Sequence, residues 1–318
     1  MTARDLKLST QPIVRPLDDW PELAVELLGA QNRVVQGPKY AHRIIETGRA
    51  GLPPLILLHG VGGHAECWAR NMRPLGERFH VVAADMVYHG YSSKEPWDDA
   101  DWVAVMAEGV VDLMDAMGWP KAHVQGESLG GHVTFELGRR FPERCDKLVL
   151  NTGLPRVQIL DERLAAASAE RKARSKLGGL SADVVRNPTF ESMHERMRWL
   201  VHEPERMTDE MVRVRLGIYQ DPTVNAAMHR VYRIDTTGKL PLPVRTEDEL
   251  AAFAPETLVF WTEHNPDWSP EYARYIADRI PNSSFYCMAD AGHWPQWEKP
   301  EEHDQVLIDF LLAEATHD

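Results

Sequence analysis

The sequence predicts an α/β fold in which a mostly parallel, doubly wound sheet carries an inserted helical lid. Short apolar runs typical of buried strands alternate with amphipathic helical patterns along most of the chain. The alternation is interrupted over residues 155–252, where Arg, Glu and Met recur in helical stretches without a buried strand pattern. A helical insertion between two parts of one parallel sheet is expected to lie over the carboxyl edge of that sheet.

Glycine and proline mark where several expected elements begin or end. A buried strand follows Pro54 and runs into a glycine-rich loop, one helix ends at Gly118, and another is stopped by Pro142. In chain order we expect a short helix at 20–28, strands at 55–58 and 81–84, a helix at 102–117, a strand at 122–125, a helix at 129–140, and strands at 147–150, 257–261 and 285–288. These elements divide the chain into an N-terminal arm (1–38), an α/β core (39–154 and 253–318) and a helical lid (155–252).

The composition excludes several classes of protein. With 318 residues, 43% hydrophobic and 26% charged, the chain is an ordinary globular protein of enzyme size rather than a disordered one. A net charge of −13 disfavours nucleic-acid or anionic-membrane partners, which require clustered Lys and Arg. The sequence has neither a long apolar run nor a signal-peptide pattern, so we expect a cytoplasmic protein. Its three cysteines form no C-x-x-C pair, which predicts reduced thiols and no metal site.

Ser128 is the predicted nucleophile. It lies in Gly-Glu-Ser-Leu-Gly-Gly (126–131), between an expected buried strand and an expected helix. At such a junction G-x-S-x-G forms a sharp turn that exposes the serine oxygen above the sheet, at the positive N-terminus of the helix. The simpler alternative is a serine that only caps the helix.

His293 is the predicted general base, because a serine hydroxyl is a weak nucleophile until a base takes its proton. It follows Gly292 in a loop after the last expected strand, and it comes after Ser128 in chain order. A solvent-exposed loop histidine is the alternative. The oxyanion needs two backbone donors, for which we predict the N–H groups of Leu129 and of Val61 in the glycine loop at 59–63.

Several motifs together resemble the meta-cleavage product hydrolases, which are α/β-hydrolases that cut a carbon–carbon bond in ring-opened aromatic dienoates. The motifs are His59-Gly60 with Trp68, Gly-Glu-Ser-Leu-Gly-Gly at 126–131 and Gly-His-Trp-Pro-Gln-Trp-Glu at 292–298. The resemblance covers residues 40–313, and the stretch at 292–298 is its most specific part. It implies an α/β-hydrolase fold with a helical lid and a hydrolase without metal or organic cofactor.

The acid of the triad is expected in the loop that follows the strand at 257–261. There the resemblance places the family's catalytic aspartate at Asn265. An asparagine can orient an imidazole, but it has no charge to stabilise an imidazolium. Asp267 is therefore the preferred acid through a shifted loop, with Glu263 or Asn265 as alternatives.

The resemblance also implies which residues contact the substrate. Arg215, in the lid, takes the role of the arginine that binds the substrate carboxylate, and its planar fork of donors suits that group. Trp294 takes a contact role, although a core tryptophan is the simpler interpretation. Glu127 and Arg70 replace other residue types found in the family, and their opposite charges lead us to expect an ion pair at the pocket floor.

The predicted reaction is hydrolysis of a vinylogous 1,5-diketone to a carboxylic acid and a dienoate. A carboxylesterase or lactonase on the same scaffold is the first alternative, because the fold does not fix the function. The second is a protein without hydrolytic activity, either a cofactor-free dioxygenase or a receptor, which Asn265 keeps open. The expected partner is a small carboxylate-bearing substrate, and the resemblance also points to a homodimer.

Overall fold

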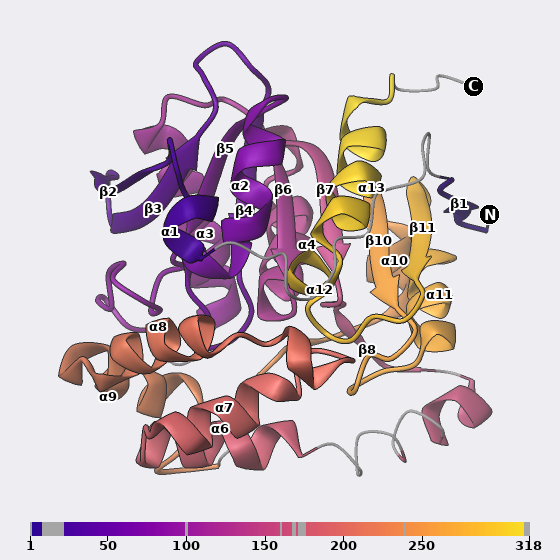
Figure 1. The fold of residues 1–318 in the computed structure, drawn as a ribbon. Helices are drawn as coiled ribbons and strands as arrows, with labels where there is room; N and C mark the ends of the chain where they lie inside the picture. The colour runs from indigo at the N-terminus through magenta and orange to yellow at the C-terminus, as the bar shows by residue number, and fades with distance from the viewer. Residues whose placement is uncertain are drawn as a thin grey trace.

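A nine-stranded sheet forms the centre of the computed structural model, which describes residues 2–7, 22–98, 101–159, 161–166, 170, 176–237 and 240–314 (Figure 1). The strands lie in the order β1-β11-β10-β7-β6-β4-β5-β3-β2. Their bounds are β1 (Arg4–Asp5), β2 (Gln31–Gln36), β3 (Ala41–Thr47), β4 (Pro54–Leu58), β5 (His80–Ala84), β6 (Ala122–Glu127), β7 (Cys145–Asn151), β10 (Glu256–Thr262) and β11 (Ser283–Met288). Of these nine strands only β3 runs opposite to the others, so the predicted mostly parallel sheet is confirmed.

All six predicted strands are present, and the sequence missed β1, β2 and β3 of this sheet as well as a short strand pair, Arg156–Val157 with Val244–Arg245, in the segment expected to be helical. β3 was missed because it carries buried polar side chains that do not form an apolar pattern. His42 lies 2.8 Å from Asp112, and Arg43 lies 2.9 Å from Glu66. These partners come from distant parts of the chain, which is why the strand can be buried without being apolar. β2 lies within the range expected to form the N-terminal arm.

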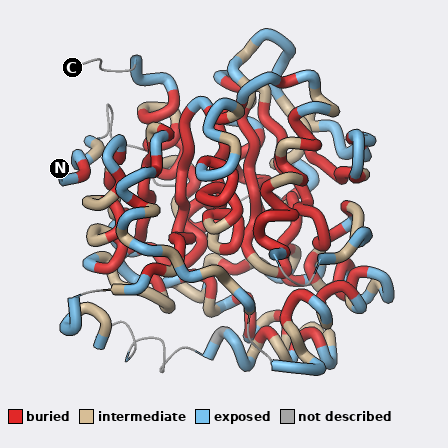
Figure 2. The backbone as a smooth tube through the Cα atoms, turned by 180° about the vertical axis from the view of Figure 1, so that it is seen from behind, coloured by how far each residue is buried: buried red, intermediate tan, exposed pale blue. Residues whose placement is uncertain are grey.

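Helices pack against the sheet in layers. α2 (Ala69–Gly76) and α13 (Pro300–Leu312) contact each other, and α3 (Trp102–Ala116) packs with α4 (Leu129–Arg140), which covers β6 and β7. The predictions of α3 and α4 are confirmed. Of the helix expected at 20–28, the structure has α1 (Leu23–Glu26), and residues 20 and 21 lie outside the described part. The remaining core helices are α10 (Glu247–Ala251), α11 (Pro270–Ala277) and α12 (Pro295–Glu298). Figure 2 shows that the central strands of the sheet are largely buried.

The residues between β7 and β10 form a helical layer beyond the carboxyl ends of the strands. α6 (Leu177–Arg186), α7 (Phe190–Arg198), α8 (Asp209–Gln220) and α9 (Pro222–Val231) lie together at that end of the molecule (Figure 1). A short parallel pair, β8 (Arg156–Val157) and β9 (Val244–Arg245), joins the two ends of this segment. Within the described residues, no helix is long and apolar enough to cross a membrane.

The end of β6 is packed closely against α4. A Cβ atom added to Gly126 would lie 2.0 Å from the carbonyl oxygen of Gly130, so the strand contacts the backbone of the helix directly. We predict that Gly126→Ala lowers the free energy of unfolding by about 2 kcal/mol, because neither backbone can move away cheaply. Urea titration followed by circular dichroism measures this.

The matched control is Gly217→Ala in α8, where an added Cβ would have no neighbour within 4 Å. This change is expected to be neutral or to stabilise by up to about 1 kcal/mol, because alanine favours a helix more than glycine does. Equal stability of the two variants would contradict the close contact between β6 and α4.

Candidate active site

Ser128 occupies a strained turn between β6 and α4. Its φ of 52° and ψ of −113° lie in a backbone region that residues other than glycine rarely adopt. The turn is enclosed by the loop after β4, where a Cβ atom added to Gly60 would lie 2.5 Å from Glu127 Oε2 and 2.9 Å from Ser128 Cβ. This is the geometry that the G-x-S-x-G pattern predicts for an exposed nucleophile at the carboxyl edge of the sheet.

A cavity of about 600 Å³ lies between the sheet edge and the lid, and Ser128 opens into it. Five of the predicted site residues line this cavity: Val61, Ser128, Leu129, Asp267 and His293. Its remaining wall comes from α4, the lid and the loops after β7 and β10, through His132, Thr152, Gly153, Leu154, Arg156, Gly178, Ser181, Ala182, Arg196, Tyr232, Ile234, Leu240, Leu242 and Trp268. The cavity therefore brings together the predicted nucleophile, base and oxyanion donors.

The imidazole of His293 lies between two side chains that a serine triad does not usually contain. Its Nδ1 is 3.2 Å from the amide nitrogen of Asn265, and its Nε2 is 3.4 Å from Oε1 of Glu127. All three residues are buried. The amide orientation of Asn265 is fixed by its oxygen, which accepts from the backbone N–H of Asp267 at 3.0 Å. The Asn265 amide nitrogen therefore donates to Nδ1.

The three residues considered for the acid are separated in the structure. Asn265 contacts His293. Asp267 lines the cavity, and its charge raises the pKa of His293. Glu263 is exposed, and its carboxylate accepts from the backbone N–H of Asp290 at 3.3 Å. Burial lowers the pKa of His293 to about 4, so that burial outweighs the charge of Asp267. His293 is therefore neutral at pH 7.

Glu127 is an unusual group for this position because its carboxyl is fully buried, with the Gly60 backbone, the Trp294 side chain and the His293 ring as its polar neighbours. Burial raises its pKa to about 8, although the charges of Arg215 and Arg196 act in the opposite direction. A carboxyl with this pKa is mostly protonated at neutral pH, which reduces the cost of burying it.

The expected ion pair between Glu127 and Arg70 is not formed. The Arg70 guanidinium donates to the carbonyl oxygen of Trp297 at 2.5 Å and stacks on its ring, with Cζ 3.8 Å from the ring centre. This contact is available because α12 brings Trp297 next to α2, a proximity that the sequence does not reveal. Glu127 faces His293 instead.

Two buried arginines from the lid lie near the site, and sequence reasoning found only one of them. Arg215 of α8 is buried with its Cζ 4.8 Å from the ring centre of Trp294, and neither residue lines the cavity. Arg196 of α7 does line it; its Nε donates to Ser181 at 2.7 Å, and its Nη1 has no partner among the described residues. No sequence signal distinguished Arg196 from the other arginines of the lid, since its position depends on how α7 packs.

The chain matches the family described as alpha/beta hydrolase fold over residues 53–300. It belongs to this family. A relative from Pseudomonas putida, 2-hydroxy-6-oxononadienedioate/2-hydroxy-6-oxononatrienedioate hydrolase 1, is 27% identical over 82% of this chain and 88% of its own. Family membership and hydrolase relatives of this kind identify the chain as an enzyme.

Solved structures of other α/β-hydrolases are similar over most of the chain. The 2-hydroxy-6-oxo-6-phenylhexa-2,4-dienoate hydrolase from Rhodococcus sp. has a TM-score of 0.71 and 24% identity, covering 89% of this chain and 99% of that one. A bacterial membrane phospholipase A also has a TM-score of 0.71, with 27% identity over 91% of this chain and 88% of that one. The predicted fold is therefore confirmed, and so is the resemblance to meta-cleavage product hydrolases.

The contact with Asn265 determines where this α/β-hydrolase holds the proton of His293. Because the amide nitrogen of Asn265 is only a donor, Nδ1 must accept, and the ring proton resides on Nε2. A base that takes a proton from serine needs a lone pair on Nε2. The resting arrangement is therefore the less reactive tautomer for activating Ser128.

We predict that Asn265→Asp raises kcat for hydrolysis of an activated aryl ester at least about a hundredfold, because a carboxylate accepts from Nδ1–H and frees the Nε2 lone pair. The backbone N–H of Asp267 that now donates to the Asn265 oxygen also suits a carboxylate. Steady-state kinetics with matched protein concentrations measures the change.

Asp267→Asn is the matched variant, because it removes the neighbouring carboxylate and keeps the volume. It is expected to change kcat by less than Asn265→Asp does. A large loss in Asp267→Asn together with no gain in Asn265→Asp would identify Asp267 as the acid and contradict the tautomer assignment.

Proposed function

We propose that this enzyme is a serine-dependent hydrolase that cleaves a carbon–carbon bond in a carboxylate-bearing, ring-opened aromatic dienoate. The observation that carries the proposal is that Ser128, His293 and Arg196 line one cavity, and that a buried guanidinium nitrogen of Arg196 has no partner among the described residues. A buried cation without a partner favours an anionic ligand, because the ligand supplies the missing charge and hydrogen bonds. The hydrolase relatives act on dienoates of this kind, as their names state.

The proposed reaction begins with ketonisation of the dienol, which creates the vinylogous 1,5-diketone. Ser128 Oγ then attacks the carbonyl carbon at the bond to be broken, and the N–H groups of Val61 and Leu129 stabilise the oxyanion. The bonding electron pair leaves with the dienoate fragment, which takes up a proton. Water hydrolyses the remaining acyl-serine and releases the carboxylic acid and Ser128.

His293 is the proposed proton carrier in these steps. It can take the Ser128 proton at Nε2 only after a change of tautomer, in which Nε2 loses its proton, Nδ1 gains one, and the Asn265 amide turns so that its oxygen accepts from Nδ1–H. That rotation breaks the hydrogen bond from Asp267 N–H to the Asn265 oxygen. We therefore expect slow formation of the acyl-enzyme in the natural chain. Glu127, 3.4 Å from Nε2, is the nearest described carboxyl that can exchange a proton with this ring.

A second candidate function is hydrolysis of carboxylic esters. The similarity to a bacterial phospholipase A, at an identity equal to that of the dienedioate hydrolase relative, favours it. Ester hydrolysis uses the same nucleophile, base and oxyanion donors, so the fold alone does not separate the two reactions. The difference lies in whether the substrate carboxylate contributes to binding in the transition state.

The deciding experiment compares kcat/KM for a ring-fission dienoate, followed by the loss of its visible absorbance, with kcat/KM for an activated aryl ester. We expect a preference for the dienoate of about a hundredfold or more, which corresponds to about 2.7 kcal/mol of differential transition-state binding. Ser128→Ala is expected to lower both rates by several orders of magnitude. Preference for the ester would establish the second function, and near-normal turnover of Ser128→Ala would exclude both.

Replacing Arg196 separates carboxylate binding from general stability. Arg196→Gln is expected to lower kcat/KM for the dienoate by about tenfold to a hundredfold, the loss of one charge-assisted contact, while leaving an uncharged ester unaffected. Arg198→Gln is the matched control, since Arg198 lies in the same helix with an exposed side chain near Glu205. Measuring kcat/KM for the dienoate with Arg215→Gln as well reports which of the two lid arginines binds the carboxylate. Equal losses for ester and dienoate in Arg196→Gln would contradict its role.

A further inference from the structure

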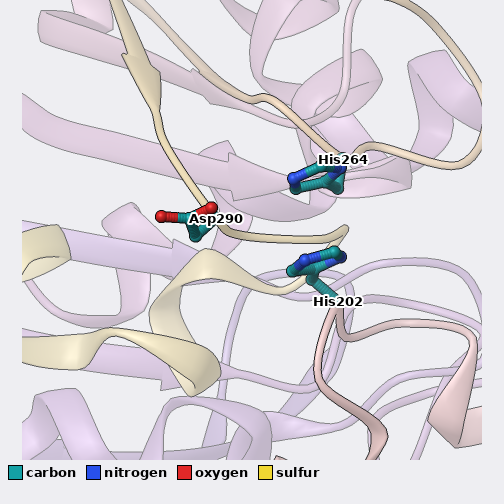
Figure 3. A group of neighbouring side chains, drawn as sticks. All are labelled: His202, His264 and Asp290. Atoms are coloured by element: carbon teal, nitrogen blue, oxygen red, sulfur yellow. The ribbon is translucent and has the colours of Figure 1, made fainter.

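Three side chains outside the cavity form a cluster of metal-ligating groups at the seam between the lid and the core. His202 comes from the segment after α7, His264 follows β10, and Asp290 follows β11. One ligand atom from each lies within 4.8 Å of the other two, and all three residues are exposed. Figure 3 shows the two imidazole rings one above the other, with the Asp290 carboxylate to one side of the pair.

We propose that His202, His264 and Asp290 form a binding site for a divalent transition-metal ion of the zinc class. Two imidazole nitrogens and one carboxylate oxygen are a ligand set that such ions favour over calcium or magnesium, which prefer oxygen alone. With three protein ligands, one coordination position remains for water. Nothing in the proposed hydrolysis uses these residues, so the site is additional to the catalytic one.

The backbones of the three ligands are held in place by contacts that do not depend on a metal. His202 N–H donates to Glu298 at 2.6 Å, and His264 N–H donates to the carbonyl oxygen of Ala291 at 3.0 Å. Asp290 N–H donates to Glu263 at 3.3 Å. β10 and β11 are parallel neighbours, so the loops that carry His264 and Asp290 end at the same sheet edge. Fixed backbones reduce the entropy lost when the side chains bind an ion.

To bind one ion, the two imidazole rings must rotate out of their stacked arrangement, because the nitrogen lone pairs of parallel rings lie in parallel planes. The rings of His202 and His264 are stacked, with centres 3.7 Å apart and planes inclined by 6°. Ligand atoms bound to one tetrahedral zinc lie ~3.4 Å apart, and the three ligand atoms, which lie within 4.8 Å of one another, can reach that separation when the exposed side chains rotate. His202 and His264 also line a surface hollow of about 470 Å³, which gives an ion access.

The proposed metal site lies where the lid meets the core. Its three ligands come from three segments, and His202 belongs to the lid while His264 and Asp290 belong to the core. His264 immediately precedes Asn265, which contacts His293, and Asp290 lies three residues before His293. A bound ion would fasten the lid to the two loops that carry the proposed base and its partner.

Zn²⁺ titration of the full chain, without a histidine tag, tests the site by isothermal calorimetry. We expect one equivalent to bind, with affinity at least about tenfold weaker in each of His202→Ala, His264→Ala and Asp290→Asn. Asn is chosen at 290 because it tolerates the left-handed backbone found there, with φ of 47°. His229→Ala is the control, since it removes a lid imidazole that is also next to an aspartate but has no second histidine in a ligand group.

A Cu²⁺ electron paramagnetic resonance spectrum reports the ligands independently of affinity. Couplings from two nitrogens are expected in the natural chain and from one in His264→Ala. Unchanged Zn²⁺ affinity in all three variants would overturn the site, and so would binding only above millimolar concentration. Weakening in one histidine variant alone would assign the ion to a single imidazole and overturn the three-ligand site. Catalytic activity is not needed for either measurement, so failure of the hydrolase proposal would leave this result interpretable.

Discussion

The close approach of β6, α4 and the loop after β4 is the constraint on which the site depends. Glycines at this junction allow a close approach where any side chain would collide, with the backbone of α4 at Gly126 and with the Glu127 and Ser128 side chains at Gly60. The resulting turn holds Ser128 at a positive φ and places it at the mouth of the cavity. The helical lid then closes the cavity from the other side, so that nucleophile and lid arginine face the same enclosed space.

The second feature of the site is that ionisable groups are buried without conventional partners. Glu127 is fully buried, and Arg215 and Arg196 each have a buried nitrogen without a hydrogen-bond partner among the described residues. Such groups are costly to bury, so their presence together is more consistent with binding than with stability. A carboxylate-bearing ligand would compensate the arginines, whereas Glu127 avoids the cost through its raised pKa of about 8.

The lid is attached to the core by polar contacts close to the proposed base. Glu298 accepts from the backbone N–H groups of His202 and Gly292, both at 2.6 Å, and therefore joins the lid segment to the loop that carries His293. Burial raises the pKa of Glu298 to about 7, although these donors favour its charged form. The same seam carries the cluster of His202, His264 and Asp290, so lid position and base orientation are coupled through one small region.

The sequence by itself determined the fold class, the buried strands and the order of Ser128 and His293, because these follow from local periodicity and from motifs within a few residues. It did not predict β3, whose buried polar residues are compensated by distant partners. Only the tertiary structure decided that Asn265 contacts His293, that Arg70 stacks on Trp297, and that Arg196 lines the cavity. These contacts join residues far apart in the chain, and their geometry depends on how the loops and the lid pack rather than on any local pattern.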